Sequence, residues 1–348
     1  MIIQKILINR LIGLIFLYGL GGILFSSIGD SESYVKGLWK GDVIETLTFS
    51  TQFIHFLTYI SGGPWVCQAL FTFFSFFGLW YPLRNEQWVI SNPLVLSALY
   101  IPSVLMWTTP VGKEAVTVLG LGLLLGCWFD YRRHRPVSAL ALIAGVYLVF
   151  LFKKQYLFPI ISGLIVYKSP FARDKDVPIF GMFLIAFFLM LFCSVYWTEL
   201  NYLFITFDKY FDPSANSTRA SIWRNDGDFL LQMPLGIWLS FMGFTPFELI
   251  ENNKLTNYFF FGESIILSLI LATLMNPKRW IHKAKSYHSA IVILLFFLIV
   301  HYPFGALNAG SAARYRSGFI PFLVFFLYLE PILPTTNIKL LRHIRANR

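Results

Sequence analysis

Long apolar runs recur along the whole chain, and they do not alternate with the period of two that a strand would show. A membrane-spanning helix needs about 20 apolar residues, within a range of about 17 to 25. Ten candidate spans emerge: 6–27, 63–82, 89–108, 114–130, 137–152, 155–168, 178–198, 259–276, 287–304 and 317–334. Because only helices and closed barrels satisfy backbone groups in hydrocarbon, we predict an all-α polytopic membrane protein with about ten spans.

Two further segments have a different pattern. Residues 34–59 mix apolar with charged positions, which is typical of an amphipathic helix on the bilayer surface. The apolar stretch within 229–258 is short and interrupted by glycine and proline, so we predict an interfacial or re-entrant segment there. No internal repeat is visible, and we expect one membrane domain over 1–348. Its outer loops would be 28–62, 199–258 and 305–316.

Charge orients these spans. If 229–258 does not cross the membrane, 17 of the 28 Lys and Arg residues lie on one side of the membrane. The inner pieces are the N-terminus, 83–88, 130–136, 168–177, 277–286 and the C-terminal tail. Because a Lys/Arg excess marks cytoplasmic loops, we expect both termini in the cytoplasm.

Composition supports the membrane assignment. Hydrophobic residues make up 56% of the 348 positions and charged residues 13%, whereas a soluble chain carries about a quarter charged residues. The net charge of +10 follows from the positive-inside bias, so the lipid bilayer and no nucleic acid is the expected partner. Cys67, Cys127 and Cys193 lie in apolar segments, which favours small buried hydrophobes over a disulfide framework or a metal cluster.

The first outer loop carries a group of polar residues from Gly29 to Tyr34. Asp30 and Glu32 stand where the first span leaves the membrane. A carboxylate there could act as a general base or hold a divalent cation, although the sequence requires no cofactor. The alternative is that Asp30 or Ser31 caps the surface helix.

A second polar group, Lys113-Glu114, follows a Pro-x-Gly turn at the outer end of a span. A charged pair at that depth is costly unless it is used or paired. Glu114 is therefore a catalytic candidate, and Lys113 is a candidate for substrate binding. Compensation of the helix dipole by Glu114 is the alternative.

Several basic residues lie outside against the orientation rule, which indicates an anionic ligand. Arginine binds phosphate in a bidentate manner, better than lysine does. For the paired lysines, snorkelling to the interface is an equal alternative. The further substrate-binding candidates are Lys153 and Lys154 in a short outer hairpin, Arg219 and Arg224 in the longest outer loop, and Arg314 and Arg316 at the outer mouth of the last span.

The order of these motifs resembles a known group of proteins. The motifs are Asp30-Ser31 with Tyr34, Pro102-Ser103 with Trp107 and Lys113-Glu114, and Arg314-x-Arg316 with Pro321. They are similar to those of bacterial O-antigen polymerases (Wzy-type) and related GT-C-like glycosyltransferases. A stretch that such proteins often read as Pro-Phe-Pro-Trp-Glu appears here as Pro246-Phe247-Glu248, without the second proline and the tryptophan.

The resemblance implies a function at the periplasmic face of a bacterial inner membrane. Such enzymes join sugar units on a polyprenyl diphosphate, so a polyprenyl-diphosphate-linked glycan is the expected substrate. Asp30, with Glu32 as its neighbour, would be the catalytic or metal-binding acid, and Arg314 and Arg316 would hold the anionic substrate. The resemblance also raises a chain-length regulator protein as a partner.

Other function classes stay open. A transporter or flippase would place charges or broken helices at the bilayer midplane, where the predicted spans carry almost none, since Glu263 and His301 are expected nearer the outer ends. An O-antigen ligase or an acyltransferase would act at the same face, and His55 and His301 are the candidate histidines for the latter. No GxxxxGK[ST] motif is present, which argues against an ATP-driven pump.

Overall fold

The computed structural model describes residues 2–15, 45–86, 88–168, 194–210, 218–251, 254–281 and 283–333. These ranges are helical with short connections and contain no strand; their one β-bridge joins Thr218 to Asn308. The predicted all-α class is therefore confirmed for the described part of the chain. Asp30, Glu32, Cys193 and most of the predicted span 178–198 lie outside it.

The α-helices are α1 (Ile2–Ile15), α4 (Glu45–Ile60), α5 (Pro64–Trp80), α6 (Pro93–Leu99), α7 (Pro102–Thr108), α8 (Lys113–Arg132), α9 (Ala139–Lys153), α10 (Leu157–Lys168), α12 (Trp197–Thr206), α13 (Asp228–Leu231), α14 (Met233–Met242), α15 (Pro246–Glu251), α16 (Leu255–Leu274), α17 (Ala284–Leu307) and α18 (Ala309–Leu329). The 3-10 turns are η2 (Tyr81–Leu83), η3 (Val89–Ser91), η4 (Lys154–Tyr156), η6 (Phe207–Tyr210) and η7 (Pro277–Trp280). Proline at the first helical position starts α5, α6 and α7, where its missing N–H costs nothing.

Five described segments are long and apolar enough to cross a membrane. They are Pro64–Leu83, Lys113–Arg132, Ala139–Lys168, Asn257–Leu274 and Ala284–Leu307. The segment Ala139–Lys168 reverses direction at η4, because Lys153 contacts Glu114 at the start of α8 whereas Lys168 contacts Tyr131 near its end. A helical membrane protein is thus supported, while the count of ten spans stays a prediction.

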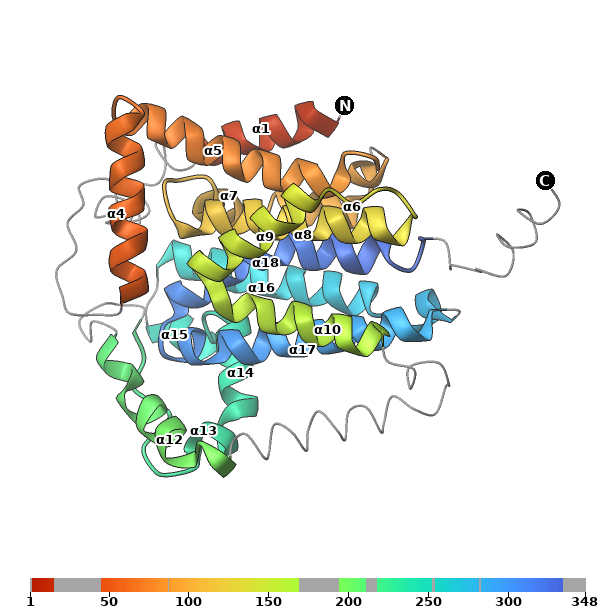
Figure 1. The fold of residues 1–348 in the computed structure, drawn as a ribbon. Helices are drawn as coiled ribbons and strands as arrows, with labels where there is room; N and C mark the ends of the chain where they lie inside the picture. Colours follow the sequence, from red (N-terminus) through yellow and green to blue (C-terminus); the bar gives the residue numbers. More distant parts are fainter. Residues whose placement is uncertain are drawn as a thin grey trace, which may run out of the picture.

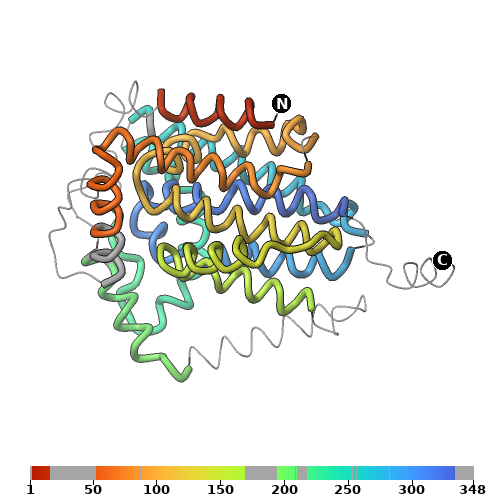
Figure 2. The backbone as a smooth tube through the Cα atoms, turned by 45° about the horizontal axis from the view of Figure 1, so that its top comes forward, coloured from red at the N-terminus to blue at the C-terminus, as the bar shows by residue number. Residues whose placement is uncertain are grey.

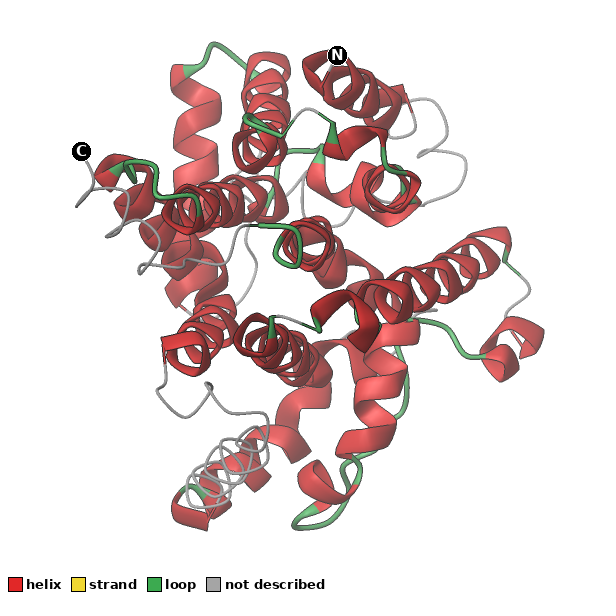
Figure 3. Cartoon of the chain, turned by 90° about the vertical axis from the view of Figure 1, so that its right-hand side faces the viewer, coloured by secondary structure: helices red, strands yellow, loops and turns green. Residues whose placement is uncertain are grey.

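The long helices form one bundle around α18, which is buried along most of its length (Figure 1). Helix α4 crosses the bundle at one end in both side views (Figures 1 and 2), as expected for a surface helix. We call this the α4 end, and the opposite one the far end. Figure 3 looks onto the far end, so that many of the bundle helices appear end-on.

Ion pairs gather at the far end. Arg132 lies 2.7 Å from Glu330, and two further pairs join Arg84 to Asp130 and Arg133 to Glu86. The start of α1 and the end of α18 lie at this end as well (Figure 1). The far end is the basic side that charge counting assigns to the cytoplasm, an orientation that stays a prediction.

The predicted span 89–108 is broken into two helices. Helix α6 ends at Leu99 and α7 begins at Pro102, with Ile101 in an extended conformation between them. Proline disfavours helix at the residue before it, which favours a break at this point, although α17 and α18 continue through Pro303 and Pro321. The break exposes backbone N–H groups at the start of α7 that need partners inside the bundle.

Two expected outer segments have local structure of their own. The interrupted stretch 229–258 contains the short helices α13, α14 and α15, and α14 packs on α17 so closely that a Cβ at Gly236 would lie 1.8 Å from the Tyr302 ring. The segment 305–316, expected as a loop, is helical apart from Asn308. The Asn308 side chain accepts a hydrogen bond from Ser311 N at 2.7 Å and starts α18 as its N-cap.

Candidate functional site

The turn between α7 and α8 brings Glu114 to the α4 end of the bundle. Gln68 of α5 holds this turn, because its amide donates to Thr109 O at 2.9 Å and accepts from Val111 N at 3.2 Å. Helix α8 then starts at Lys113 without a side-chain cap. Glu114 lies in its first turn, where a carboxylate compensates the positive end of the helix dipole.

Three helices converge on the Glu114 carboxylate. Arg314 of α18 donates to both of its oxygens, from Nε to Oε1 at 2.8 Å and from Nη2 to Oε2 at 3.3 Å. Lys153, at the end of α9, places Nζ 3.8 Å from Oε1. We call Glu114, Lys153 and Arg314 the Glu114 cluster; Lys113 precedes Glu114 as the first residue of α8. The structure therefore brings together three residues that the sequence placed in three separate motifs.

Aromatic rings surround these charges. The Lys153 ammonium lies 3.6 Å from the ring centroid of Tyr315, and the Arg314 guanidinium lies 5.5 Å from the ring of Trp107. Both distances are within the range of cation–π attraction. The indole Nε1 of Trp107 is buried and makes no hydrogen bond with the described part of the chain. A buried N–H of this kind suits a ligand acceptor.

The charges of the Glu114 cluster lie largely away from solvent. Lys113, Glu114 and Lys153 are each less than 10% exposed. Lys153 and Arg314 both lie beside the carboxylate of Glu114. Charges at this depth are favourable only where they are paired and hydrogen-bonded. Cations from two different helices thus lie together at the α4 end.

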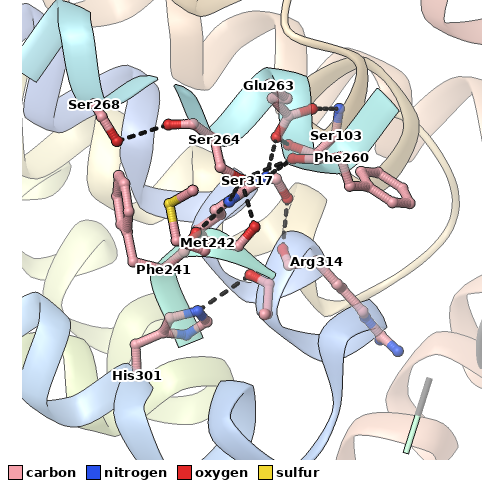
Figure 4. Close-up of polar contacts among 12 residues, drawn as sticks. Ser103, Phe241, Met242, Phe260, Glu263, Ser264, Ser268, His301, Arg314 and Ser317 are labelled. Atoms are coloured by element: carbon pink, nitrogen blue, oxygen red, sulfur yellow. Dashed lines mark hydrogen bonds and ion pairs between the residues drawn. The ribbon is translucent and has the colours of Figure 1, made fainter. Parts of the chain in front are cut away.

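Arg316 lies elsewhere, although it is only two residues from Arg314. It is fully buried and pairs with Glu263 of α16 at 2.7 Å. Its guanidinium also donates to Ser264 Oγ at 2.5 Å and to the carbonyl oxygens of Phe241 and Phe260. Figure 4 shows the Arg314 side chain pointing away from the group around Glu263. Arg316 thus joins helices inside the bundle and does not reach an outer mouth.

Glu263 also binds the start of α7, the second helix of the broken span 89–108. Its Oε2 accepts a hydrogen bond from Ser103 N at 2.8 Å, and its Oε1 accepts one from Ser103 Oγ (Figure 4). Ser103 is the second residue of α7. The carboxylate therefore accepts hydrogen bonds at the N-terminus of this helix, where backbone N–H groups have no partner within the helix. We call Glu263 and Arg316 the Glu263 pair. Ser103 is the residue of α7 that donates hydrogen bonds to it.

Arg219 is a structural clamp in this structure. It pairs bidentately with Glu248 and donates to the carbonyl oxygens of Gly243, Gly305 and Ala306. Burial raises the pKa of the Glu248 carboxyl, but the hydrogen bonds and charge of Arg219 outweigh burial, so this pKa lies below its ordinary value. Thr245 and Glu248 also form a capping box at the start of α15, which the sequence Thr-Pro-Phe-Glu could have revealed.

The other predicted site residues are not brought together with the cluster. Lys154, the first residue of η4, and Arg224 are exposed, and Arg224 N donates to Asp228 Oδ2 at 2.8 Å. His301 is buried, with Nε2 3.1 Å from Ala312 O. No group of three or more His, Cys, Asp or Glu side chains that could hold a metal ion occurs within the described ranges.

Sequence reasoning missed the roles of Trp107 and Tyr315 as aromatic walls and the pairing of Glu263 with Arg316. The sequence did contain a signal for the pair of Glu263 with Arg316, because a carboxylate and an arginine inside apolar helices each need a partner. The chain was also compared with known proteins. No family model matches it, and neither does any curated protein or solved structure.

Proposed function

We propose that the protein is a glycosyltransferase of the polysaccharide-polymerase type, which joins polyprenyl-diphosphate-linked sugar units at the periplasmic face of a bacterial inner membrane. The observation that carries this proposal is the Glu114 cluster, in which Arg314 and Lys153 meet the Glu114 carboxylate at the α4 end of an apolar helix bundle. A lipid-linked diphosphate has matching features, since its tail stays in the bilayer and its charged head lies at the surface.

The cluster supplies what glycosyl transfer from a diphosphate needs most. An acceptor hydroxyl attacks the anomeric carbon, the bond from that carbon to the diphosphate oxygen breaks, and the diphosphate leaves with the electron pair. Arg314 can hold a phosphate through two N–H groups, and Lys113 and Lys153 add charge as the leaving group forms. The reaction requires no protein nucleophile.

Glu114 then acts as the residue that positions Arg314. A carboxylate that accepts two hydrogen bonds from a guanidinium and lies near an ammonium is a weak base. The proton of the acceptor hydroxyl is better taken by Asp30 or Glu32, the acids that the resemblance assigns to this role. Both precede the surface helix α4 in the chain, and their placement stays a prediction.

The test is complementation of a deletion strain with single variants. We expect Arg314→Gln to abolish long-chain polysaccharide and to leave lipid-linked single units, because the leaving diphosphate loses its bidentate partner. Arg135→Gln is the matched control, since Arg135 is an exposed arginine of the far end. Normal chain length with Arg314→Gln at an unchanged protein level would reject the proposal. Lys154→Gln and Arg224→Gln rank the two exposed candidates in the same assay.

A second candidate function, transport or flipping of a lipid-linked glycan, is favoured by one observation. The break between α6 and α7 lies against the Glu263 pair, about 12 Å along α16 and α18 from their starts. Broken helices whose positive ends meet charged groups are typical of transporter sites. Accumulation of lipid-linked units in the cytoplasmic leaflet of the deletion strain would favour this function over polymerisation.

A further inference from the structure

The bundle contains an apolar cavity of about 480 Å³ between α8, α9, α10, α17 and α18. Leu125, Ile160, Ile293 and Leu323 are among its lining side chains, and nearly all of its wall is hydrocarbon. This volume falls within the range of about 300–1,000 Å³ that is typical of small-molecule sites. Its lining residues Leu142 and Leu164 are exposed at the surface of the bundle, so the cavity opens towards lipid.

The depth of the cavity matches one leaflet. Its wall on α8 runs from Leu121 to Tyr131, and these two positions lie about 15 Å apart along the helix. The hydrocarbon core of a bilayer is about 30 Å thick, so one leaflet contributes about 15 Å. The α18 lining residues, Phe322, Leu323 and Phe326, come from the part of that helix nearer the far end, and on α10 the lining extends from Ile160 to Lys168 at its end. The cavity therefore belongs to the leaflet at the far end.

A layer of rings closes the cavity towards the α4 end. Phe297 stacks on Phe319 with ring centroids 4.6 Å apart, and Tyr156 packs edge-on against both rings. Tyr156 OH also donates to Tyr315 O at 2.9 Å, on the side of the Glu114 cluster. The cavity is thus separated from that cluster, and its occupant differs from the head of the proposed substrate.

The mouth of the cavity carries a lysine. Lys168 ends α10, is exposed, donates to Tyr131 OH and lies 4.5 Å from the centroid of the Tyr131 ring. Arg132 nearby is already paired with Glu330. Among the described lining residues, Lys168 is the cation placed to meet a phosphate at the membrane surface. A lysine near the surface also favours a lipid with net negative charge.

We infer that this cavity binds one acyl chain of an anionic phospholipid from the leaflet at the far end, with the lipid phosphate on Lys168. The chain fills the space between α8 and α17, and the headgroup lies beside Lys168 and the Tyr131 hydroxyl. The inference is independent of the proposed glycosyl transfer, because the ring layer separates the two sites.

The test uses the full chain in nanodiscs that contain phosphatidylglycerol with a photoreactive group midway along one acyl chain. After illumination, peptide mapping should find labels on the cavity wall, at Leu125, Ile293 or Leu323, above the level on lipid-facing Leu140 and Ile143. Photoreactive phosphatidylcholine should label the wall about fivefold less. Equal labelling by both lipids, or labels confined to the lipid-facing residues, would overturn the inference.

Two variants locate the chain and the headgroup. Lys168→Gln should lower wall labelling by phosphatidylglycerol about fivefold, whereas Lys278→Gln, an exposed lysine of the far end that does not line the cavity, should leave it unchanged. Ile293→Trp should remove wall labelling by filling the space. If Ile293→Trp does not fold, wall labelling of the Lys168→Gln variant still tests the inference. Displacement of the label by polyprenyl phosphate, but not by unlabelled phosphatidylglycerol, would assign the cavity to a prenyl chain and overturn the inference.

Discussion

Helix α18 carries two arginines two residues apart, and each pairs with a glutamate in a different setting. Arg316 and Glu263 have side chains 0% and 1% exposed, and their charges balance. Arg314 and Glu114 have side chains 15% and 4% exposed, and Lys153 Nζ lies 3.8 Å from the same carboxylate. On an α-helix, positions i and i+2 lie about 200° apart, so the two arginines point to opposite faces.

The contrast separates a structural pair from a candidate binding site. The Glu263 pair fixes the broken helix α7 to α16 and α18, and all its strong contacts stay inside the protein. The Glu114 cluster has two cations beside one carboxylate, an aromatic ring beside each cation and, in Trp107, a buried indole N–H that makes no hydrogen bond with the described residues. Removing charge should therefore unfold the first region and inactivate the second.

The largest expected effect is on the Glu263 pair. Glu263→Ala leaves Arg316 buried without a counter-charge, which should cost about 3–5 kcal/mol of stability. The monodisperse fraction in detergent size-exclusion chromatography should fall close to zero. The double variant Glu263→Leu with Arg316→Met removes both charges and should restore most of the folded protein. If Glu263→Ala alone is as stable as the wild type, the pair is not a structural element.

The next effect concerns Glu114 and distinguishes positioning from proton transfer. Glu114→Gln should lower the rate of polymerisation per folded protein about 10- to 100-fold, because Arg314 loses its alignment. The acidic limb of the pH–rate profile should stay where it is in the wild type. The assay uses membrane vesicles supplied with lipid-linked repeat units. Loss of that acidic limb would make Glu114 itself the base and overturn its positioning role.

The sequence predicted the helical class and, to within four residues, the bounds of α5, α8, α9, α10, α16 and α17, because apolar runs and prolines act locally. It also selected Lys113, Glu114, Lys153 and Arg314, since charges near span ends stand out against an apolar background. It could not predict that Glu114, Lys153 and Arg314 meet while the Arg316 side chain points into the bundle. That difference depends on the rotation of α18 and on the start of this helix at Ala309, where a loop was expected.

The same limit explains the broken span 89–108. Pro102 was visible in the sequence, but proline alone does not show whether a membrane helix bends or stops. The stop depends on Glu263, which lies 160 residues away and accepts from Ser103 N and Oγ. The contact of Glu263 with Ser103 depends on how α7 and α16 pack, which the local sequence does not reveal. From the sequence, Glu263 was expected nearer the outer end of its span, but Arg316 and Ser103 were not predicted as its partners.

A third pair, Arg219 with Glu248, is more exposed and should respond to pH. The pKa of Glu248 lies below its ordinary value, so this pair contributes stability above the unfolded pKa of about 4.3 and loses it as pH falls through the folded pKa. Glu248→Gln should lower stability by about 1 kcal/mol at pH 7.5, and less as the pH falls below about 4. Thermal unfolding at several pH values measures this difference. A constant difference across that range would contradict the assignment.

The smallest effect tests the indole N–H of the Glu114 cluster. Trp107 Nε1 is buried and makes no hydrogen bond with the described residues, so Trp107→Phe removes a donor that the protein itself does not use there. If a phosphate or sugar oxygen accepts from this N–H, the apparent KM for lipid-linked units should rise about 3- to 10-fold, equivalent to one net hydrogen bond. Stability should change little, since the ring beside Arg314 is largely kept. Trp128→Phe is the matched control, because the Trp128 indole donates to Glu330 at the far end, and its loss should lower stability without raising KM. An unchanged KM in Trp107→Phe would remove this indole from the binding site and leave the charge of the cluster as its only means of holding the anion.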